Sequence, residues 1–154
     1  MESHHQQTNM CKISEVTVKD LCKINELEMK LNLNKTKLNF FNQIFLNENF
    51  KFIKLISKGQ IIGFLLFSWN KSDCDIISIG VVKKLQKMNH GKKLIEYIKN
   101  LNFKNIYVEV SEKNRNAIIF YRKLNFLKIG LRKKYYKKQN LDAILLKLEN
   151  FDYI

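Results

Sequence analysis

Two side chains in the second half of the sequence are suited to proton transfer. Glu109 lies within the apolar segment at residues 106–110, IYVEV, where strand alternation places the aliphatic side chains on one face and Glu109 on the other. A carboxylate in such a strand either lies at an exposed sheet edge or serves as a general base. Tyr121 follows on a predicted helix, where it is either a core aromatic or a proton donor.

A turn that could bind phosphate precedes both residues. Residues 86–91, QKMNHG, open directly into a helix, and Lys92 and Lys93 occupy its first turn. The positive end of the helix dipole disfavours cations there unless an anion is bound. Backbone N–H groups at a helix start, together with these lysines, can hold phosphate groups. A solvated helix start in a lysine-rich protein is the alternative interpretation.

The strand before this turn contains a glycine. Residues 76–82 read IISIGVV, and Gly80 interrupts a mostly β-branched run. A glycine in a buried strand usually marks a bulge, or the close approach of another backbone or a ligand. We therefore expect something to lie against Gly80.

Two asparagines flank the helix that carries Tyr121. Asn114 is placed to cap its N-terminus. Asn125 follows where a glycine C-cap would be usual, and asparagine is the next most tolerant residue of the left-handed conformation. The intervening apolar residues have helical spacing: Ala117, Ile118, Tyr121 and Leu124.

These features together resemble the acetyl-CoA-binding half of the GNAT superfamily of N-acetyltransferases. The family's turn pattern, Gln/Arg-x-x-Gly-x-Gly/Ala, reads here Gln86-x-x-Asn89-x-Gly91. Its later helix ends Tyr-x-x-x-Gly-Phe, which reads Tyr121-x-x-x-Asn125-Phe126. Both departures replace glycine by asparagine, the mildest substitution that a left-handed position allows.

The resemblance implies a role for each candidate residue. Glu109 would be the general base and Tyr121 the general acid, and Asn114 would hold the amide arm of acetyl-CoA, although its role as a helix cap is equally good. No metal or redox cofactor is implied. The other residues expected to bind acetyl-CoA come from the strand and the turn: Ile79, Gly80, Val81, Lys87, Met88, Asn89, His90, Gly91 and Lys92.

The order of predicted elements agrees with a GNAT fold of mixed α/β class. We expect a polar, disordered tail at residues 1–10 and a single domain at 11–150. The domain would hold a mixed, mostly antiparallel sheet of six to seven strands flanked by about four helices. Before the central stretch we expect a strand at 11–18, a helix from Lys19 or Asp20 with Leu21, Ile24, Leu27 and Met29 on its apolar face, and a second helix from Thr36.

Hairpins account for most of the remaining chain. Residues 50–57 and 60–69 read as strands joined by the two-residue turn Lys58-Gly59. The helix after the phosphate turn has Leu94, Ile95, Ile98 and Leu101 at helical spacing. Residues 127–136 and 141–148 form a closing antiparallel pair.

The closing pair gives the best indication of substrate. Tyr135, Tyr136 and Asp142-Ala143 resemble residues of the ribosomal-protein-alanine N-acetyltransferases, the RimI group. This resemblance implies that the tyrosines hold the N-terminus of a protein, with a ribosomal protein the leading candidate, and that Asp142 supports the hairpin. An amphipathic strand pair with ordinary aromatics is the alternative.

Two observations argue against a simple transfer of that substrate. The family's Phe-Pro-Trp-Ser-like segment is replaced by MKLNLNK at residues 29–35. The net charge of +14 should also repel the basic start of the ribosomal substrate. A local group of acids near the first helix would soften that repulsion: Glu15, Asp20, Glu26 and Glu28.

The basic composition has a second explanation. The chain has no proline and abounds in Lys, Asn, Ile and Phe, as an AT-rich coding sequence would produce. Its lysines are scattered, so a solvated surface is favoured over a nucleic-acid site, although a weak affinity for RNA or ribosomes remains open. Cys11, Cys22 and Cys74 fit no metal-ligand spacing, and reduced cysteines in a cytoplasmic protein are expected.

No segment of the sequence reads as a membrane span or secretory signal. The longest apolar run, residues 61–69, is too short to cross a bilayer. The expected function is transfer of an acetyl group from acetyl-CoA to a protein N-terminus. The alternatives are acetylation of a small amine such as a polyamine or aminoglycoside, and a non-catalytic module that binds RNA or a ribosome.

Overall fold

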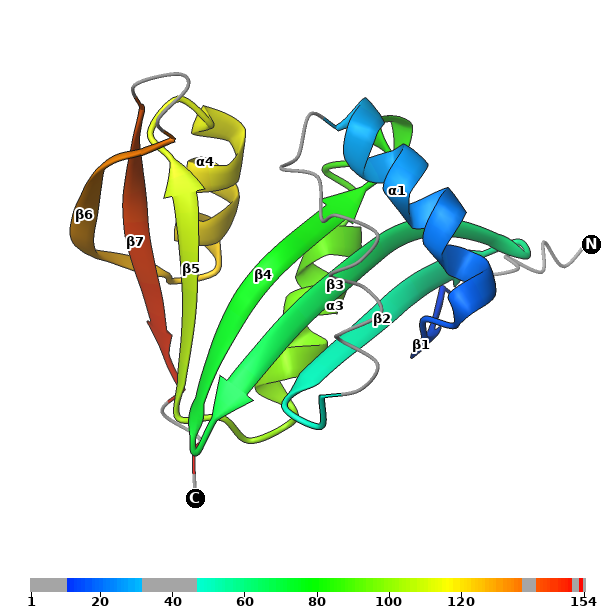
Figure 1. The fold of residues 1–154 in the computed structure, drawn as a ribbon, viewed down its shortest axis with the longest axis horizontal. Coiled ribbons are helices and arrows are strands. Elements are labelled where there is room, and N and C mark those ends of the chain that lie inside the picture. Colours follow the sequence, from blue (N-terminus) through cyan, green and yellow to red (C-terminus); the bar gives the residue numbers. More distant parts are fainter. Residues whose placement is uncertain (1–10, 32–46, 137–140, 151–152, 154) are drawn as a thin grey trace, which may run out of the picture.

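A single seven-stranded sheet organises the protein (Figure 1). The computed structural model describes residues 11–31, 47–136, 141–150 and 153, apart from the side chains of residues 134–136. The strands are β1 (Lys12–Glu15), β2 (Phe50–Ser57), β3 (Gln60–Asn70), β4 (Asp73–Val81), β5 (Asn105–Ser111), β6 (Leu127–Tyr136) and β7 (Leu141–Glu149). Their order in the sheet is β1-β2-β3-β4-β5-β7-β6.

All neighbouring strands are antiparallel except β4 and β5, which are parallel. The expected mixed, mostly antiparallel sheet is therefore confirmed. The turn predicted at Lys58-Gly59 is also confirmed, because Ser57 pairs with Gln60 and both turn residues have positive φ.

Helices cover both faces of the sheet. The described residues include three α-helices, α1 (Leu21–Lys30), α3 (His90–Lys99) and α4 (Arg115–Lys123), and short 3-10 turns at Val18–Asp20 and Lys83–Leu85. One buried cluster joins the sheet to α1, and a larger cluster joins the opposite face to α3 and α4. The second helix expected from Thr36 lies outside the described residues.

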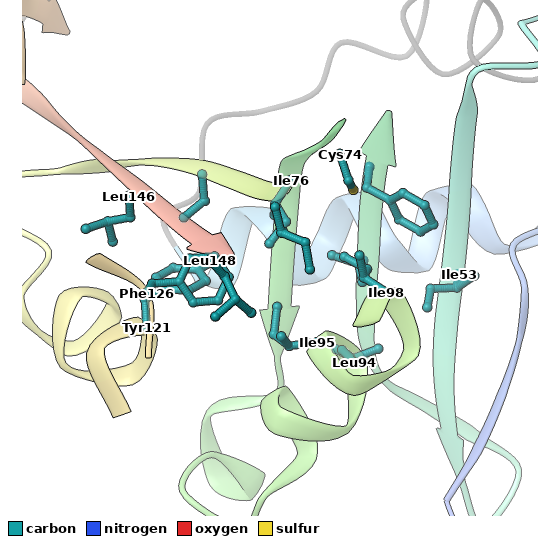
Figure 2. Packing of buried hydrophobic residues seen from close by; sticks show 14 of the residues in the cluster. Ile53, Cys74, Ile76, Leu94, Ile95, Ile98, Tyr121, Phe126, Leu146 and Leu148 are labelled. Atoms are coloured by element: carbon teal, nitrogen blue, oxygen red, sulfur yellow. The ribbon is translucent and has the colours of Figure 1, made fainter. Parts of the chain in front are cut away.

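The larger cluster fixes the two halves of the sheet against α3 and α4. Figure 2 shows Tyr121 and Phe126 packed beside Leu146 and Leu148, with the side chains of α3 continuing the layer toward β2. Apolar side chains recur at helical spacing on α3 and at alternate positions on β5, so burying both faces forms one continuous core.

Two apolar residues were assigned wrongly to buried faces. Met29 is 51% exposed because it points away from the α1 stripe. Leu101 is 39% exposed because α3 ends at Lys99, which leaves Leu101 in the following turn. In the part of the chain that the structure describes, no helix is long and apolar enough to cross a membrane.

The three cysteines are free thiols, as expected, and Cys74 is fully buried. Burial raises the pKa of the Cys74 thiol to about 12. The cysteine thiol of an unfolded chain has a pKa of about 8.5. Between these values the unfolded chain releases a proton that the folded chain retains, so the free energy of unfolding must fall as the pH rises.

We expect this fall to be about 1 kcal/mol per pH unit above about pH 9. Urea unfolding at pH 8, 9 and 10 measures the fall in the free energy of unfolding. In Cys74→Ala this free energy should depend less on pH, whatever the stability of the variant at pH 8. The control is Cys22→Ala, which replaces an exposed thiol. Equal slopes for Cys74→Ala and the unmodified protein would contradict the prediction.

Candidate active site

A β-bulge in β4 opens the sheet between β4 and β5. Phe67 of β3 pairs with Ile76, whereas the preceding Leu66 pairs with Ser78, so Ile77 has no partner in β3. The parallel ladder to β5 ends at the same point, with the pair between Ile76 and Val108. Because a bulge bends and twists its strand, the two strands diverge beyond it (Figure 1).

The divergence leaves a stretch of backbone beside an open interval. Ile79, Gly80 and Val81 pair with β3 on one side, but the ladder to β5 does not extend to them. Because successive residues of an antiparallel pair alternate in facing the partner strand, part of this backbone faces the interval and can pair with an extended polar ligand. The Val81 carbonyl oxygen already accepts a hydrogen bond from Gln86 Nε2 at 3.0 Å. Ile79, Gly80 and Val81 are the strand residues that the sequence analysis expected to bind acetyl-CoA.

Gly80 is explained by side chains on the α1 face. A Cβ atom at Gly80 would lie 2.8 Å from Leu31 Cδ1 and 2.8 Å from Phe64 Cε1. The close approach expected at Gly80 is therefore made by these two side chains, and the bulge lies at Ile77 instead. Gly80 lets the end of α1 pack onto the strand that borders the interval.

A buried carboxylate fixes α1 to the same part of β4. Glu28 is fully buried, and the Ser78 hydroxyl donates a hydrogen bond to Glu28 Oε1 at 3.2 Å. Together with the contact between Leu31 and Gly80, this bond docks the last turn of α1 on the diverging strand. Sequence reasoning did not assign a site role to Glu28 or Ser78.

Two of the four acids near α1 are withdrawn from the negative surface expected for a basic substrate. Glu28 is inaccessible to solvent, and Asp20 is 2.6 Å from Lys54 Nζ. Burial opposes ionisation of Asp20, but hydrogen bonds from Lys54 and Thr17 hold its pKa below the usual value. Glu26 and Glu15 are 3.8 Å and 3.7 Å from the ammonium groups of neighbouring lysines. Glu28 and Asp20 therefore add little negative charge to the surface, whereas the side chains of Glu15 and Glu26 are 76% and 62% exposed.

Glu109 lies at the mouth of the interval. It directly follows Val108, the last β5 residue paired with β4, and its side chain is 30% exposed. Arg132 of β6 reaches across β7 to place Nη2 2.7 Å from Glu109 Oε1. β5 is a central strand, but at Glu109 it pairs only with β7, because the ladder to β4 ends at Val108. Arg132 is a further site residue, which sequence reasoning did not assign.

Tyr121 lies on the other face of the sheet. It is 3% exposed and packs against Phe120 and Phe126, with ring centroids 5.0 Å and 5.1 Å away. Burial raises the pKa of Tyr121 above its ordinary value, so the hydroxyl stays protonated at neutral pH. Among the described residues this hydroxyl has no hydrogen-bond partner.

The structure does not bring Glu109 and Tyr121 into contact. Val108 and Val110 belong to the core cluster that contains Tyr121, so the intervening Glu109 faces away from it. The two side chains therefore lie on opposite faces of the sheet. This arrangement suits a donor that enters from one side and an acceptor that enters from the other.

The turn before α3 has the backbone shape of an anion site. Lys87 and Asn89 have φ of 62° and 65°, and Asn89 is the N-cap residue of α3. Left-handed residues beside a helix start curl the backbone so that successive N–H groups converge on one point. The asparagine that replaces the motif glycine thus retains the left-handed conformation.

Asn89 offers a direct test of this geometry. Asn89→Ala is expected to lower the free energy of unfolding by about 1 kcal/mol, because alanine tolerates positive φ poorly. It should also raise KM for acetyl-CoA. Asn89→Gly, measured in the same urea and kinetic experiments, should match or exceed the original protein in stability. Equal behaviour of the two variants would contradict the role given to the backbone conformation.

The start of α3 is held by contacts with α4 on one side and with Cys11 on the other. A Cβ atom at Gly91 would lie 3.0 Å from the Phe120 ring, so glycine allows α3 to pack closely on α4. Lys93 Nζ donates to the Cys11 carbonyl oxygen, and Cys11 Sγ lies 3.6 Å from His90 Nδ1. Met88 and Lys92 are exposed. Lys92 rather than Lys93 is therefore the lysine that can meet an anion.

The two helix-flanking asparagines behave as expected. Asn114 Oδ1 accepts a hydrogen bond from the Ala117 N–H at 3.1 Å, which confirms the N-cap. Asn125 has a φ of 70°, as expected for a left-handed C-cap. The NH2 group of Asn114 is on an exposed residue at the end of β5, so the cap does not prevent it from binding a ligand.

The expected peptide-binding residues are described in part. Tyr135 and Tyr136 belong to β6, and Tyr136 pairs with Leu141, but their side chains lie outside the described residues. The Asp142 carbonyl oxygen accepts a hydrogen bond from the Glu112 N–H at 3.0 Å, which joins the hairpin to the loop before α4. Over the described ranges, no group of acids, histidines and cysteines is placed to hold a metal ion.

Comparison with known proteins identifies similar sequences and folds. Residues 19–126 match the family model of the Acetyltransferase (GNAT) family. The chain is 32% identical over 95 residues to the [ribosomal protein bS18]-alanine N-acetyltransferase of Haemophilus influenzae. That alignment covers 59% of this chain and 64% of the relative, which is less than two thirds of its length.

Two solved structures share the fold at low identity. The ribosomal-protein-S18-alanine N-acetyltransferase of Escherichia coli has a TM-score of 0.80 at 22% identity, covering 91% of this chain and 94% of that chain. Arabidopsis thaliana NAA60 in complex with acetyl-CoA has a TM-score of 0.80 at 16% identity, covering 91% and 98%. The whole described architecture therefore has counterparts in solved structures.

Proposed function

Because the chain belongs to the GNAT acetyltransferase family, we propose that it transfers an acetyl group from acetyl-CoA to the α-amine of a protein N-terminus. The observation that carries this proposal is the bulge at Ile77. It ends the β4–β5 ladder at Ile76 and Val108, and so leaves the β4 backbone beyond Ile76 without a strand partner on the side where Glu109 follows Val108. A ribosomal protein with an N-terminal alanine is the leading substrate.

The residues beside the interval fit an acetyl-CoA molecule. The backbone groups of the stretch Ile79–Val81 that face the interval match an extended arm that contains amides, although the Val81 carbonyl oxygen already accepts from Gln86 Nε2 at 3.0 Å. Asn114 can add a side-chain donor. The N–H groups from Lys87 to Lys92, which surround two left-handed residues at a helix start, suit the phosphates. The thioester of acetyl-CoA supplies the activated acyl group.

Glu109 and Tyr121 supply the two proton transfers. Glu109 accepts a proton from the attacking amine, directly or through a water, as the new C–N bond forms. Tyr121 donates its hydroxyl proton as the C–S bond breaks and the thiolate leaves. An α-amine needs only a moderate base, because its reference pKa is about 7.7 to 8.0, against about 10.4 for lysine.

Two observations support a protein N-terminus as the acceptor. The Haemophilus influenzae relative and the Escherichia coli structural neighbour are both named for acetylating the alanine of a ribosomal protein. Tyr135 and Tyr136 belong to β6, the strand from which Arg132 reaches Glu109, so this strand lies beside the proposed base.

A thiol-release assay with acetyl-CoA tests the proposal. We would offer a peptide with a free N-terminal alanine, the same peptide with an acetylated N-terminus, and spermidine. The expected result is turnover of the free peptide alone. Turnover of spermidine alone would assign the enzyme to small amines and overturn the choice of acceptor. Absence of turnover with all three would contradict the proposed activity on such peptides.

A further inference from the structure

A cavity lies at the opposite end of β4 from the candidate active site. It has a volume of about 700 Å³ and is walled by the ends of β2 and β3, the turn between β3 and β4, and the loop between α3 and β5. Its principal residues are Lys51, Trp69, Lys71, Ser72, Phe103 and Tyr153. Glu109 directly follows Val108, which pairs with Ile76, so about five residues of strand, roughly 16 Å at about 3.3 Å per residue, separate it from Ser72 at the cavity.

Aromatic rings form the apolar part of this cavity. The Trp69 ring lies 5.9 Å from the Phe67 ring and 6.1 Å from the Phe103 ring, measured between centroids. Both phenylalanines are buried, whereas Trp69 is half-buried and Tyr153 is 41% exposed. The indole is thus fixed in position by its buried neighbours while part of it faces the cavity. A fixed, partly exposed ring is suited to stacking with a flat ligand.

Two lysines give the cavity a positive charge. Lys71 is exposed, and its φ of 54° places it in the two-residue turn between β3 and β4. Lys51 lies over the Tyr97 ring, 5.4 Å from its centroid, and 3.7 Å from Glu15 Oε1. The Tyr97 hydroxyl contributes most to raising the pKa of Lys51, so this ammonium stays charged.

We propose that this cavity binds an unpaired nucleotide of a single-stranded nucleic acid. The base would stack on Trp69, and the flanking phosphates would pair with Lys51 and Lys71. Aromatic stacking beside a cationic surface is the usual way in which proteins bind unpaired bases. An acidic peptide would satisfy the lysines but would leave the indole without a flat partner. Binding here would leave the candidate active site open, and it does not depend on the proposed acetyl transfer.

Trp69 makes the proposal directly measurable, because it is the single tryptophan of the chain. We would titrate the full chain with oligouridylate and with oligothymidylate, and follow the intrinsic tryptophan fluorescence at fixed salt. The expected result is saturable quenching by at least one of the two oligonucleotides, whereas inorganic polyphosphate of similar charge leaves the tryptophan emission unchanged. Quenching by polyphosphate to the same extent would overturn the proposal, since it would report polyanion binding without stacking.

Matched variants separate the cavity from the general positive charge. Lys71→Glu is expected to weaken binding about tenfold, and Lys128→Glu, the same charge change on edge strand β6, by no more than about twofold. Trp69→Leu, followed by anisotropy of a labelled strand, should weaken binding about tenfold. Equal effects of the two lysine variants, or no quenching by any strand, would overturn the proposal. The thiol-release assay is a separate readout, so either proposal can fail alone.

Discussion

Glu109→Gln is expected to lower kcat/KM for a peptide with a free N-terminus by about 10²–10³-fold. Glutamine keeps the shape of the side chain and an oxygen that can accept from Arg132, which lies 2.7 Å from Glu109. The fold and the affinity for acetyl-CoA should therefore change little. The variant loses the acceptor for the amine proton. Steady-state kinetics measure this loss of catalysis, and binding calorimetry shows whether the affinity for acetyl-CoA has changed.

The pH dependence adds a second readout of this variant. A larger fraction of the substrate α-amine is neutral at pH 9 than at pH 7, because its reference pKa is about 7.7 to 8.0. The ratio of kcat/KM between the original protein and Glu109→Gln should therefore become smaller as the pH rises. Glu112→Gln, an exposed residue in the next loop, is the matched control and should behave like the original protein. An unchanged kcat/KM for Glu109→Gln would contradict the role of general base.

Tyr121→Phe is expected to lower kcat by about 10²-fold. The change removes only the hydroxyl and keeps the ring that packs between Phe120 and Phe126. Because that hydroxyl has no partner among the described residues, the free energy of unfolding should change by less than about 1 kcal/mol. Single-turnover kinetics and urea unfolding on the same preparation measure both effects.

The kcat of Tyr121→Phe, compared with the stability of Tyr121→Ala, distinguishes a proton donor from a core aromatic. Burial raises the pKa of Tyr121, so no loss of activity from its ionisation is expected below the ordinary range of tyrosine. Tyr121→Ala, by contrast, should destabilise the fold by about 3–5 kcal/mol through the cavity it leaves. If Tyr121→Phe retains the full kcat, the residue is a core aromatic only.

Much of the fold could be predicted because local patterns and the sheet agree. The alternating apolar residues of β5, the Lys58-Gly59 turn and the helical spacing on α3 each specify one conformation, and each was found where expected. The left-handed positions at Asn89 and Asn125 could also be predicted, because asparagine tolerates positive φ better than most residues.

The parts that could not be predicted depend on contacts between distant segments. Arg132 meets Glu109 only through the register of β6, β7 and β5, which no local pattern specifies. The bulge at Ile77 shifts the strand by one residue without a glycine to mark it. Glu28 did carry a signal, since it continues the apolar stripe of Leu21 and Ile24 on α1, and an acid on a buried stripe indicates a polar partner.

Locating the transferred acetyl group tests the account most directly. A peptide that carries both a free N-terminal alanine and an internal lysine would be incubated with the protein and acetyl-CoA, and the product sequenced by tandem mass spectrometry. The account predicts acetylation of the N-terminal amine, with the lysine unmodified and with the product lost in Glu109→Gln. Acetylation of the lysine side chain instead, or an equal yield from Glu109→Gln, would contradict it.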